Sequence, residues 1–249
     1  MILKNYSITL PSYSIGDNVY SKIGEICEPY GKKVICIGGK TAISKVRDLI
    51  INECNGTSLE ILDFLWYGGD ATYENVNTLK ENELVKKADI IFGIGGGKAL
   101  DTAKALAYIT NKEIFTFPTI ASNCAGTTAV SIMYNADGSF KEPFFFTAPA
   151  RHCFIYTPVI AKSPDKYMWA GIGDTYAKYF EAEMSSRGED LVHYHALGVT
   201  TSQMCLTPLL KYGKKALDDF KSGTASFEVE QVVLGIVVTT GIASILLTN

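Results

Sequence analysis

The chain carries three consecutive glycines and a lysine, Gly95, Gly96, Gly97 and Lys98, at a point suited to binding a ligand through the backbone. They follow an apolar, strand-like run at 90–94, and apolar residues at spacings of three and four then predict a helix. Glycine has no Cβ, so it lets backbone N–H groups approach a ligand closely. A helix N-terminus adds unpaired N–H donors and a partial positive charge. The order strand, glycines, helix therefore predicts a phosphate-binding site.

The glycine run differs from the two best-known phosphate motifs. A P-loop has Ser or Thr after its lysine, whereas Ala99 follows Lys98 in this chain. A dinucleotide fingerprint read from Gly93 requires glycine at the position that Lys98 occupies. A tight turn without a ligand is the alternative interpretation. Adjacent glycines cost chain entropy that a turn alone does not require, so we favour phosphate binding.

Two aspartates lie where a carboxylate could take part in chemistry. Asp101 falls in the first turn of the helix predicted after the glycines, where its charge suits the positive end of the dipole, and a catalytic role for it stays open. Asp174 lies in the segment GIGDTYAKYFEAE, where we expect Gly171 and Gly173 to leave room around its carboxylate. The alternative is a surface pair between Asp174 and Lys178, four residues on. A helix needs no glycines merely to expose such a pair, so we favour a functional carboxylate.

Apolar runs that alternate with amphipathic stretches predict the elements that position these residues. Strands are expected at 34–37, 59–66, 90–94, 114–117, 130–134, 140–146 and 154–156, and helices at 42–52, 74–87 and 102–109. The strands on either side of the turn at Asp137–Gly138 predict a hairpin. Strands alternating with helices indicate a parallel sheet covered on both faces. The carboxyl ends of its strands, where ligands bind, would bring together Gly38–Gly39, Gly95–Gly97 and Pro118–Ser122.

The character of the chain changes near residue 162. Ser163 and Pro164 are a typical helix start, with serine as the N-cap and proline at the first helical position. From Asp165 onward the pattern predicts only helices, interrupted near 187–189 and 221–224. We therefore place a domain boundary at about 160, between an α/β domain at 1–160 and an all-α domain at 161–249.

The last eighteen residues, 232–249, contain no charged side chain. That length is near the minimum for a membrane span. The segment contains Gly, Thr and Ser at several positions and has no basic flank, so we interpret it as a buried helix. A buried helix at the end of a chain needs partners around it, and the sequence therefore looks truncated at its C-terminus. Left uncovered, this helix would cause aggregation or oligomerisation.

Composition and charge exclude several partners. The net charge of −3 offers no basic surface for nucleic acid. The six cysteines are scattered without a CxxC pair, and Cys36 lies in an apolar run where a buried, reduced thiol is the simplest interpretation. The N-terminal segment lacks the apolar core of a signal peptide. We expect a cytoplasmic protein with no nucleic-acid and no membrane partner.

Three segments together carry a family resemblance: GIGGGKALDTAK, FPTIASNCAGTTAVSIMY and AGIGDTYAKYFEAE. In this order they resemble the glycerol dehydrogenases of the iron-containing (group III) alcohol dehydrogenase family. The resemblance extends over nearly the whole chain. It implies a dehydroquinate-synthase-like fold, with an N-terminal α/β nucleotide domain and a C-terminal all-helical domain. It also implies that NAD and a divalent metal lie between the two domains.

The resemblance assigns roles to individual residues. Gly95, Gly96, Gly97 and Lys98 would hold the dinucleotide pyrophosphate, Thr119 and Ser122 would line the cofactor cleft, and Thr128, Val130 and Tyr134 would contact the nicotinamide half. Asp174 would be a metal ligand, usually of zinc in glycerol dehydrogenases, and would lie at the substrate. That metal would polarise the substrate hydroxyl and favour the alkoxide from which hydride leaves.

The sequence departs from the family pattern at the metal and at the substrate. The family takes two histidines from a later helical segment, and the chain ends before that segment. His193 and His195 are two residues apart, which puts them on different faces of a helix, and His152 lies before the domain boundary. Cys124 occupies the position of the family's glycerol-contacting Asp, and a thiol is a weak hydrogen-bond partner, so the substrate need not be glycerol.

The cofactor position also departs from the family pattern. The acidic residue that would bind the ribose 2′-hydroxyl after the first strand is absent from Gly38–Gly39–Lys40. With Lys40 nearby, a 2′-phosphate is compatible with the site, so NADP is an alternative to NAD.

The sequence therefore supports one leading function and two alternatives. The leading hypothesis is NAD(P)-dependent, metal-assisted oxidation of glycerol or a similar small polyol, by a homo-oligomer acting on a small-molecule alcohol. The first alternative is a catalytically incomplete remnant that binds a nucleotide and turns nothing over. The second keeps the enzyme but changes the substrate, for example to glycerol 1-phosphate. The segment YNADGSFKEPFFF resembles the glycerol dehydrogenase hairpin more than that of the phosphate-using relatives.

Overall fold

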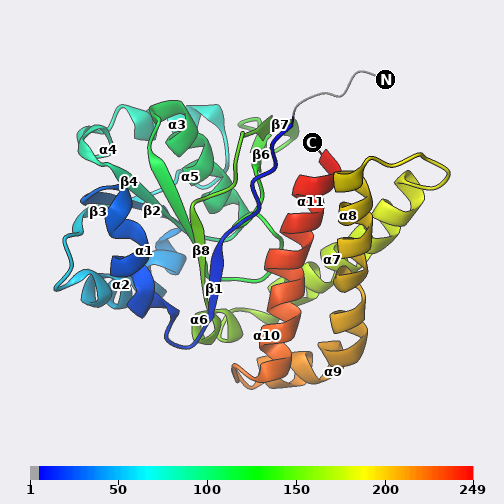
Figure 1. Ribbon diagram of the computed structural model, residues 1–249. Helices are drawn as coiled ribbons and strands as arrows, with labels where there is room; N and C mark the ends of the chain where they lie inside the picture. The colour runs from blue at the N-terminus through cyan, green and yellow to red at the C-terminus, as the bar shows by residue number, and fades with distance from the viewer. Residues whose placement is uncertain (1–5, 249) are drawn as a thin grey trace.

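The computed structural model describes residues 6–248 and divides them into a sheet with covering helices and a group of helices beside it (Figure 1). The strands are β1 (Tyr13–Gly16), β2 (Lys33–Gly38), β3 (Glu60–Trp66), β4 (Ile90–Gly95), β5 (Glu113–Pro118), β6 (Val130–Tyr134), β7 (Phe140–Phe145) and β8 (His152–Tyr156). The helices are α1 (Ile23–Cys27), α2 (Lys40–Cys54), α3 (Tyr73–Lys80), α4 (Glu83–Lys87), α5 (Gly97–Thr110), α6 (Thr157–Ala161), α7 (Asp165–Ser185), α8 (His193–Ser202), α9 (Thr207–Lys221), α10 (Phe227–Leu234) and α11 (Thr240–Thr248).

Six strands form one parallel sheet in the order β1-β8-β5-β4-β2-β3. The central strand β4 is buried along its whole length, as its uninterrupted apolar sequence requires between two helical layers. On one face, α1 and α2 pack residues such as Ile23, Val46 and Ile50 against the sheet. On the other face, α3, α4 and α5 supply residues such as Val76 and Leu106. The predicted parallel sheet covered on both faces is confirmed.

The direction in which the chain crosses the sheet reverses between β2 and β4. From β2 the chain runs through α2 to β3, its neighbour on one side, and from β4 it runs through α5 to β5, on the opposite side. At such a switch point the two loops diverge and leave a crevice beyond the carboxyl ends of the strands. The glycines at 95–97 lie at this point, because they connect β4 to α5.

The helix predicted over 74–87 is two helices, α3 and α4, so that prediction was wrong. The break comes at Asn82, whose side-chain oxygen accepts hydrogen bonds from the N–H groups of Leu84 and Val85. Asparagine is a favourable N-cap because its side chain satisfies N–H groups that a helix start leaves unpaired. This local cap allows the chain to begin a second helix in a new direction.

The predicted hairpin is present as β6 and β7, an antiparallel pair separate from the main sheet. It packs on α5, where Met133 joins the buried cluster that contains Ala103 and Leu106. The hairpin therefore lies beside the helix that begins at the glycine loop, and its first strand bonds to Asp101 and Lys104 of that helix.

Beyond Tyr156, where the last strand ends, the described chain is helical. The helix start predicted at Ser163 and Pro164 was wrong by one position, because Pro164 is the N-cap residue and α7 begins at Asp165. The Ser163 N–H instead bonds to the carbonyl of Ile160 at the end of α6, and its hydroxyl has no hydrogen-bond partner among the described residues. The chain changes from strand to helix around residue 160. That two domains meet there stays a prediction.

The apolar segment at the end of the chain is a core helix through Thr248, while Asn249 and residues 1–5 lie outside the described residues. The stretch Phe227–Thr248 is long and apolar enough to cross a membrane by length and composition. In this structure 67% of its most apolar window is buried inside the protein. Val232, Val233 and Ile236 pack with Ile155 of β8 in one cluster, so this helix joins the helical part to the sheet.

Glycines make a close contact between the sheet and the helical part. A Cβ on Gly171 of α7 would lie 2.2 Å from the carbonyl oxygen of Ala121, and one on Gly241 of α11 would lie 2.0 Å from Thr127 Oγ1. Thr127 also donates a hydrogen bond to the carbonyl of Val237, within the π-helical turn Gly235–Thr239. The loop after β5 is therefore held against two helices of the second part.

Candidate functional site

A cavity of about 860 Å³ opens at the carboxyl ends of β2 and β4 and extends to α7. Most of the site residues predicted from sequence line it: Gly95, Gly96, Gly97, Lys98, Ser122, Cys124, Thr128, Val130, Tyr134 and Asp174. Thr119 is the exception, because it lines a neighbouring cavity of about 550 Å³. The two cavities share Thr41, Ala42, Gly96, Ile120 and Tyr167, so they are adjoining parts of one crevice.

The glycine loop presents the start of α5 to the cavity. Gly95 has a φ of +142°, a conformation that side chains rarely adopt, and Gly96 is the N-cap residue with no side-chain cap on the helix. The helix therefore begins at Gly97 with its first N–H groups and its positive dipole end directed at the cavity lining. This geometry can hold an anion such as a phosphate.

Packing also requires glycine at the next two positions. A Cβ on Gly96 would meet Ile120 Cδ1 at 2.5 Å, and one on Gly97 would meet Asn123 Nδ2 at 2.5 Å. The loop 120–123 therefore lies directly on the glycines. Packing therefore gives these two positions a reason to be glycine, and phosphate binding at the run stays a prediction.

Lys98 already has a partner in this structure. Its Nζ lies 2.6 Å from Oδ2 of Asp70, in the loop that follows β3, and 4.9 Å from the ring centre of Tyr134. The hydrogen bond to Asp70 raises the pKa of Lys98. The side chain of Lys98 is 48% exposed, so an arriving phosphate could reach it.

Asp101 forms a buried ion pair, not a contact with the helix dipole. The helix begins at Gly97, so Asp101 lies beyond the first turn, and the prediction that it falls within that turn was wrong. Its Oδ1 lies 3.0 Å from Nζ of Lys104, whose side chain is 2% exposed. Burial raises the pKa of the Asp101 carboxyl, while the Lys104 ammonium acts in the opposite direction.

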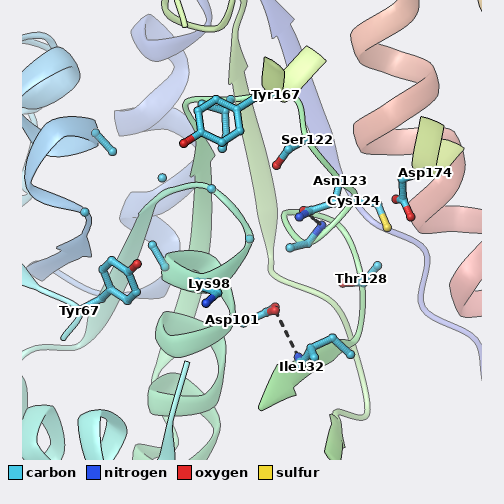
Figure 2. A pocket seen from close by; sticks show the side chains of 18 of the residues that line it. Tyr67, Lys98, Asp101, Ser122, Asn123, Cys124, Thr128, Ile132, Tyr167 and Asp174 are labelled. Carbon is cyan, nitrogen blue, oxygen red and sulfur yellow. Dashed lines mark hydrogen bonds between the residues drawn. The ribbon is translucent and has the colours of Figure 1, made fainter. Parts of the chain in front are cut away.

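The same pair fastens the hairpin to α5. Oδ2 of Asp101 accepts a hydrogen bond from the N–H of Ile132, shown dashed in Figure 2. Lys104 donates to the carbonyl of Val130 and to Thr128 Oγ1. Two residues predicted to contact the cofactor, Thr128 and Val130, are thus positioned by a buried lysine. A carboxylate and an ammonium left without each other at this depth would each cost several kcal/mol.

Asp174 and Cys124 lie at the same end of the cavity, away from Tyr67 (Figure 2). Burial raises the pKa of Asp174, and burial followed by the charge of Asp174 raises the pKa of the Cys124 thiol to about 12. Lys178 lies 4.0 Å from Asp174 but only 2.7 Å from Glu181. The surface pair considered as an alternative for Asp174 is therefore loose, and the carboxylate remains available to a ligand.

The two glycines next to Asp174 have different surroundings. Gly171 is required by the contact with the Ala121 carbonyl, not by space around the carboxylate. A Cβ on Gly173 would have nothing within 4 Å. Of the two positions, only Gly171 has a packing reason to be glycine.

Within residues 6–248 no group of three or more His, Cys, Asp or Glu side chains could hold a metal ion. His152 lies in β8, where Ser12 and Ser14 contact its two ring nitrogens, and His193 begins α8. A catalytic zinc site takes three protein ligands and an open position. Asp174 could supply one of them, but the described residues do not provide a complete set.

The cavity contains residues that the sequence interpretation missed. Tyr67 follows β3, Asn123 lies between Ser122 and Cys124, and Tyr167 and Lys178 come from α7. Tyr167 lies seven residues before Asp174, and Lys178 lies four residues after it. Such spacings place side chains on one face of a helix, so the position of Asp174 would have indicated both residues. Tyr67 gave no comparable signal, because only the order of strands in the sheet brings the end of β3 near the glycine loop.

Comparisons with a family model and with known protein sequences give matches that agree with one another. A family model for iron-containing alcohol dehydrogenase matches residues 11–153 of the chain. The glycerol dehydrogenase of Escherichia coli O6:H1 is 27% identical over 225 residues, which cover 89% of this chain and 61% of that protein. The glycolaldehyde reductase of Halobacterium salinarum is 26% identical over 226 residues, which cover 89% of this chain and 62% of that protein.

A solved structure has the same fold. The crystal structure of glycerol dehydrogenase from Schizosaccharomyces pombe superimposes with a TM-score of 0.86 at 24% identity, covering 97% of this chain and 62% of that one. At this identity the likeness is one of fold. The chain spans about 60% of the length of the proteins with which it is compared here.

Proposed function

The chain belongs to the iron-containing alcohol dehydrogenase family, and on that premise we propose that it binds NAD(P) and oxidises a small alcohol by hydride transfer to the nicotinamide. One observation carries the proposal. The glycine loop and the start of α5 open into the cavity at the switch point between β2 and β4, and Asp174 lies across that cavity. A cofactor bound by its phosphates at the loop would have its reactive end within the crevice between sheet and helices.

The residues of the chain have distinct parts in this proposal. Gly95, Gly96 and Gly97 would hold the pyrophosphate through backbone N–H groups, and Lys98 would add a positive charge. The bound dinucleotide supplies the hydride acceptor. Ser122 and Thr119 would line the two parts of the crevice that the cofactor spans.

The hairpin and the loop before it would contact the nicotinamide half. Thr128, Val130 and Tyr134 line the cavity beside α5, and the Asp101–Lys104 pair holds the first two in position. Because β6 is fastened at buried atoms, these contacts would be rigid before the cofactor arrives. Such preorganisation lowers the entropy cost of orienting the two reactants.

A metal would complete the proposed site, and Asp174 is the residue proposed to bind it. The family is named for iron, and zinc was expected from the resemblance, with Asp174 as a ligand. Asp174 and the neighbouring Cys124 offer one carboxylate and one thiol, which is short of a complete site.

The substrate proposed is a small polyol such as glycerol. Two relatives of nearly equal similarity bear the names glycerol dehydrogenase and glycolaldehyde reductase, so small hydroxylated compounds are the common element. Cys124 and Asp174 would lie at the substrate, where a thiol that stays protonated is a weaker hydrogen-bond partner than a carboxylate. A substrate other than glycerol, for example glycerol 1-phosphate, is the alternative within the same family.

The setting of the protein also belongs to the proposal. All six cysteines are free, and all except Cys124 are buried, which suits a reducing cytoplasm.

Trp169, Tyr176 and Phe180 are exposed on α7, at spacings that put them on one stripe of the helix. Such a stripe supports assembly into a homo-oligomer, which the molar mass in solution would test.

The test measures binding and turnover separately on the purified chain. Dinucleotide binding is followed by calorimetry, and NAD(P)H formation is followed by absorbance with glycerol and with other small alcohols. We expect binding to weaken in Gly97→Ala, whose Cβ would lie 2.5 Å from Asn123. Gly213→Ala is the matched control, because nothing lies within 4 Å of its Cβ position on α9.

The outcomes distinguish the proposal from its alternative. Binding together with alcohol-dependent NAD(P)H formation supports the dehydrogenase. Binding without turnover on any alcohol, with metal supplied, favours a nucleotide-binding remnant. A chain that binds neither dinucleotide would contradict both.

A further inference from the structure

The helix α7 forms one wall of the cavity, and its polar side chains follow one another along that wall. The residues of α7 that line the cavity are Tyr167, Asp174 and Lys178. Tyr167 also lines the adjoining cavity, so Lys178, eleven residues on and about 16 Å along the helix axis, lies at the opposite end. Asp174 and Cys124 lie toward this same end (Figure 2).

The ammonium of Lys178 brings a positive charge to this end of the cavity. Its Nζ lies 4.0 Å from Oδ1 of Asp174 and 2.7 Å from Oε2 of Glu181. The side chain of Glu181 is 60% exposed and does not line the cavity, so the closer partner of Lys178 lies outside it. An exposed ion pair of this kind contributes at most about 1 kcal/mol. An anionic ligand inside the cavity can therefore compete with Glu181 for Lys178.

The last helical segment of the chain lies alongside α7 and runs in the same direction. A Cβ on Gly171 of α7 would lie 2.9 Å from Cδ1 of Ile236. Four residues further along both segments, the Thr240 hydroxyl donates a hydrogen bond to Thr175 Oγ1 at 3.2 Å. The contact between the two segments therefore advances by about one helical turn on each of them at a time.

The next turn of the two helices brings Lys178 and Ser244 to the same end of the cavity, which both residues line. The Ser244 hydroxyl has no hydrogen-bond partner among the described residues. Cys124 adds an S–H group, which is a weak donor. Burial raises the pKa of that thiol and the Lys178 ammonium acts in the opposite direction, so the two groups lie close enough to interact. This end of the cavity is therefore rich in hydrogen-bond donors.

The charges at this end match a ligand that carries one negative charge. Among the described residues of the helical part that line the cavity, Asp174 is the only acidic one, and it is the residue proposed to bind the metal. Lys178 then supplies one positive charge for the substrate. A carboxylate has one negative charge, whereas a phosphate ester has about one and a half to two at neutral pH. The single ammonium therefore favours a carboxylate over a phosphate.

We infer that the preferred substrate is a small hydroxy acid, and that Lys178 is the side chain that pairs with its carboxylate while Ser244 donates a second hydrogen bond. The inference rests on the proposed function, since it names the substrate class of that same site. The hydroxyl-bearing carbon of such a substrate would pass a hydride to the nicotinamide, and the hydroxyl proton would pass to solvent. The product would be the corresponding oxo acid.

The experiment compares two pairs of ligands on the full chain. Glycerate and glycerol differ only in a carboxylate that replaces one hydroxymethyl group, and lactate and propylene glycol differ in the same way. Affinity is measured by calorimetry with NADH or NADPH present, because a reduced dinucleotide cannot accept a hydride from these ligands. We expect each acid to bind about tenfold or more tightly than its neutral partner, the scale of a hydrogen bond to a charged group.

Substitutions on α7 test the part played by the charge. In Lys178→Gln the advantage of the acids should fall by about tenfold, whereas Lys178→Arg keeps the charge and should retain most of that advantage. Glu181→Gln removes the competitor outside the cavity and should raise the advantage about two- to fivefold. Lysine, glutamine and arginine have similar helix propensities, and thermal unfolding would verify that each variant is folded.

Lys215→Gln is the matched control. Lys215 also forms an exposed ion pair within one helix, with Asp219 of α9, but it lines none of the cavities described above. This variant should keep the preference of the unaltered chain.

The possible failures of the two proposals are distinct. If the neutral alcohols bind as tightly as the acids to the unaltered chain, the inference is wrong while the dehydrogenase proposal stands. If the preference exists but survives Lys178→Gln, the assignment of Lys178 is wrong. Tighter binding of glycerol 1-phosphate than of glycerate would overturn the choice of a carboxylate. If a dinucleotide binds but none of these ligands does, the inference fails alone, and if no dinucleotide binds, the proposed function fails with it.

Discussion

Lys98, the lysine that follows the three glycines, is bonded to Asp70, with 2.6 Å between Nζ and Oδ2. The two residues are 28 positions apart in sequence: Lys98 lies in the first turn of α5, and Asp70 lies in the loop after β3. The loop that carries Asp70 is itself held in place, because Asn75 Nδ2 donates to the Asp70 carbonyl and the Tyr67 hydroxyl donates to the carbonyl of Gly69. A phosphate at the glycine loop must therefore compete with a carboxylate for this lysine.

Removing that competitor should strengthen ligand binding. In Asp70→Asn the Lys98 ammonium keeps a polar neighbour but loses the opposite charge, so we expect dinucleotide affinity to rise about two- to fivefold, the scale of an exposed ion pair. Calorimetric titration at low and at physiological salt measures the change. Glu113→Gln removes a comparable exposed pair with Arg151 away from the cavity and should leave the affinity unchanged. An affinity that falls in Asp70→Asn would mean that Asp70 itself holds the ligand.

The buried pair between Asp101 and Lys104 should be strongly coupled. Asp101→Asn leaves the Lys104 ammonium buried without its partner, and Lys104→Met leaves the carboxylate, so each should lower the free energy of unfolding by about 3 to 5 kcal/mol. The double variant should lose less than the sum of the two. Urea unfolding of all four proteins measures the coupling. Additive losses would show that the two charges do not depend on each other.

Stability should fall in mild acid because of His152. Burial lowers the pKa of His152 to about 4, below the ordinary value of 6.5. The folded protein therefore keeps this ring neutral while the unfolded chain takes up a proton, so the contribution is present above pH 6.5 and is lost as the pH falls from 6.5 toward 4. The loss amounts to about 3 kcal/mol at most. Chemical denaturation across this range measures it, and an unchanged pH slope in His152→Gln would contradict the assignment.

Two neighbouring glycines of α7 should respond to the same substitution with opposite signs. Gly171→Ala forces a methyl group toward the Ala121 carbonyl, 2.2 Å away, and should destabilise the protein by about 1 to 3 kcal/mol. Gly173→Ala meets nothing within 4 Å and should stabilise the helix by roughly 0.5 to 1 kcal/mol. Thermal and urea unfolding compare the two. Equal effects would mean that the contact between α7 and the loop after β5 is less close than the structure has it.

Local patterns predicted most elements of the fold correctly. The strands at 34–37, 90–94 and 114–117 are almost entirely apolar. Such a segment is buried inside a parallel sheet whichever strands lie next to it. The hairpin depended on a turn at Asp137–Gly138, which is also a local signal. Two errors came where a single side chain decided a boundary, as Asn82 does between α3 and α4 and Pro164 does before α7, and the short strand β1 was not predicted.

The sequence by itself determined the glycine loop, because the order strand, glycines, helix is contained in one short segment from Ile90 to Lys104. The rule for parallel sheets also predicted that Gly38–Gly39 and Pro118–Ser122 lie near it. Only the tertiary structure decided which side chains from other elements reach the loop: the order of strands puts Trp66 and Tyr67 beside it, and the loop after β3 brings Asp70 to Lys98. The physical reason is that pairing between distant strands and packing between helices depend on the whole core. Spacing along the chain carries information only about residues within the same helix, strand or turn.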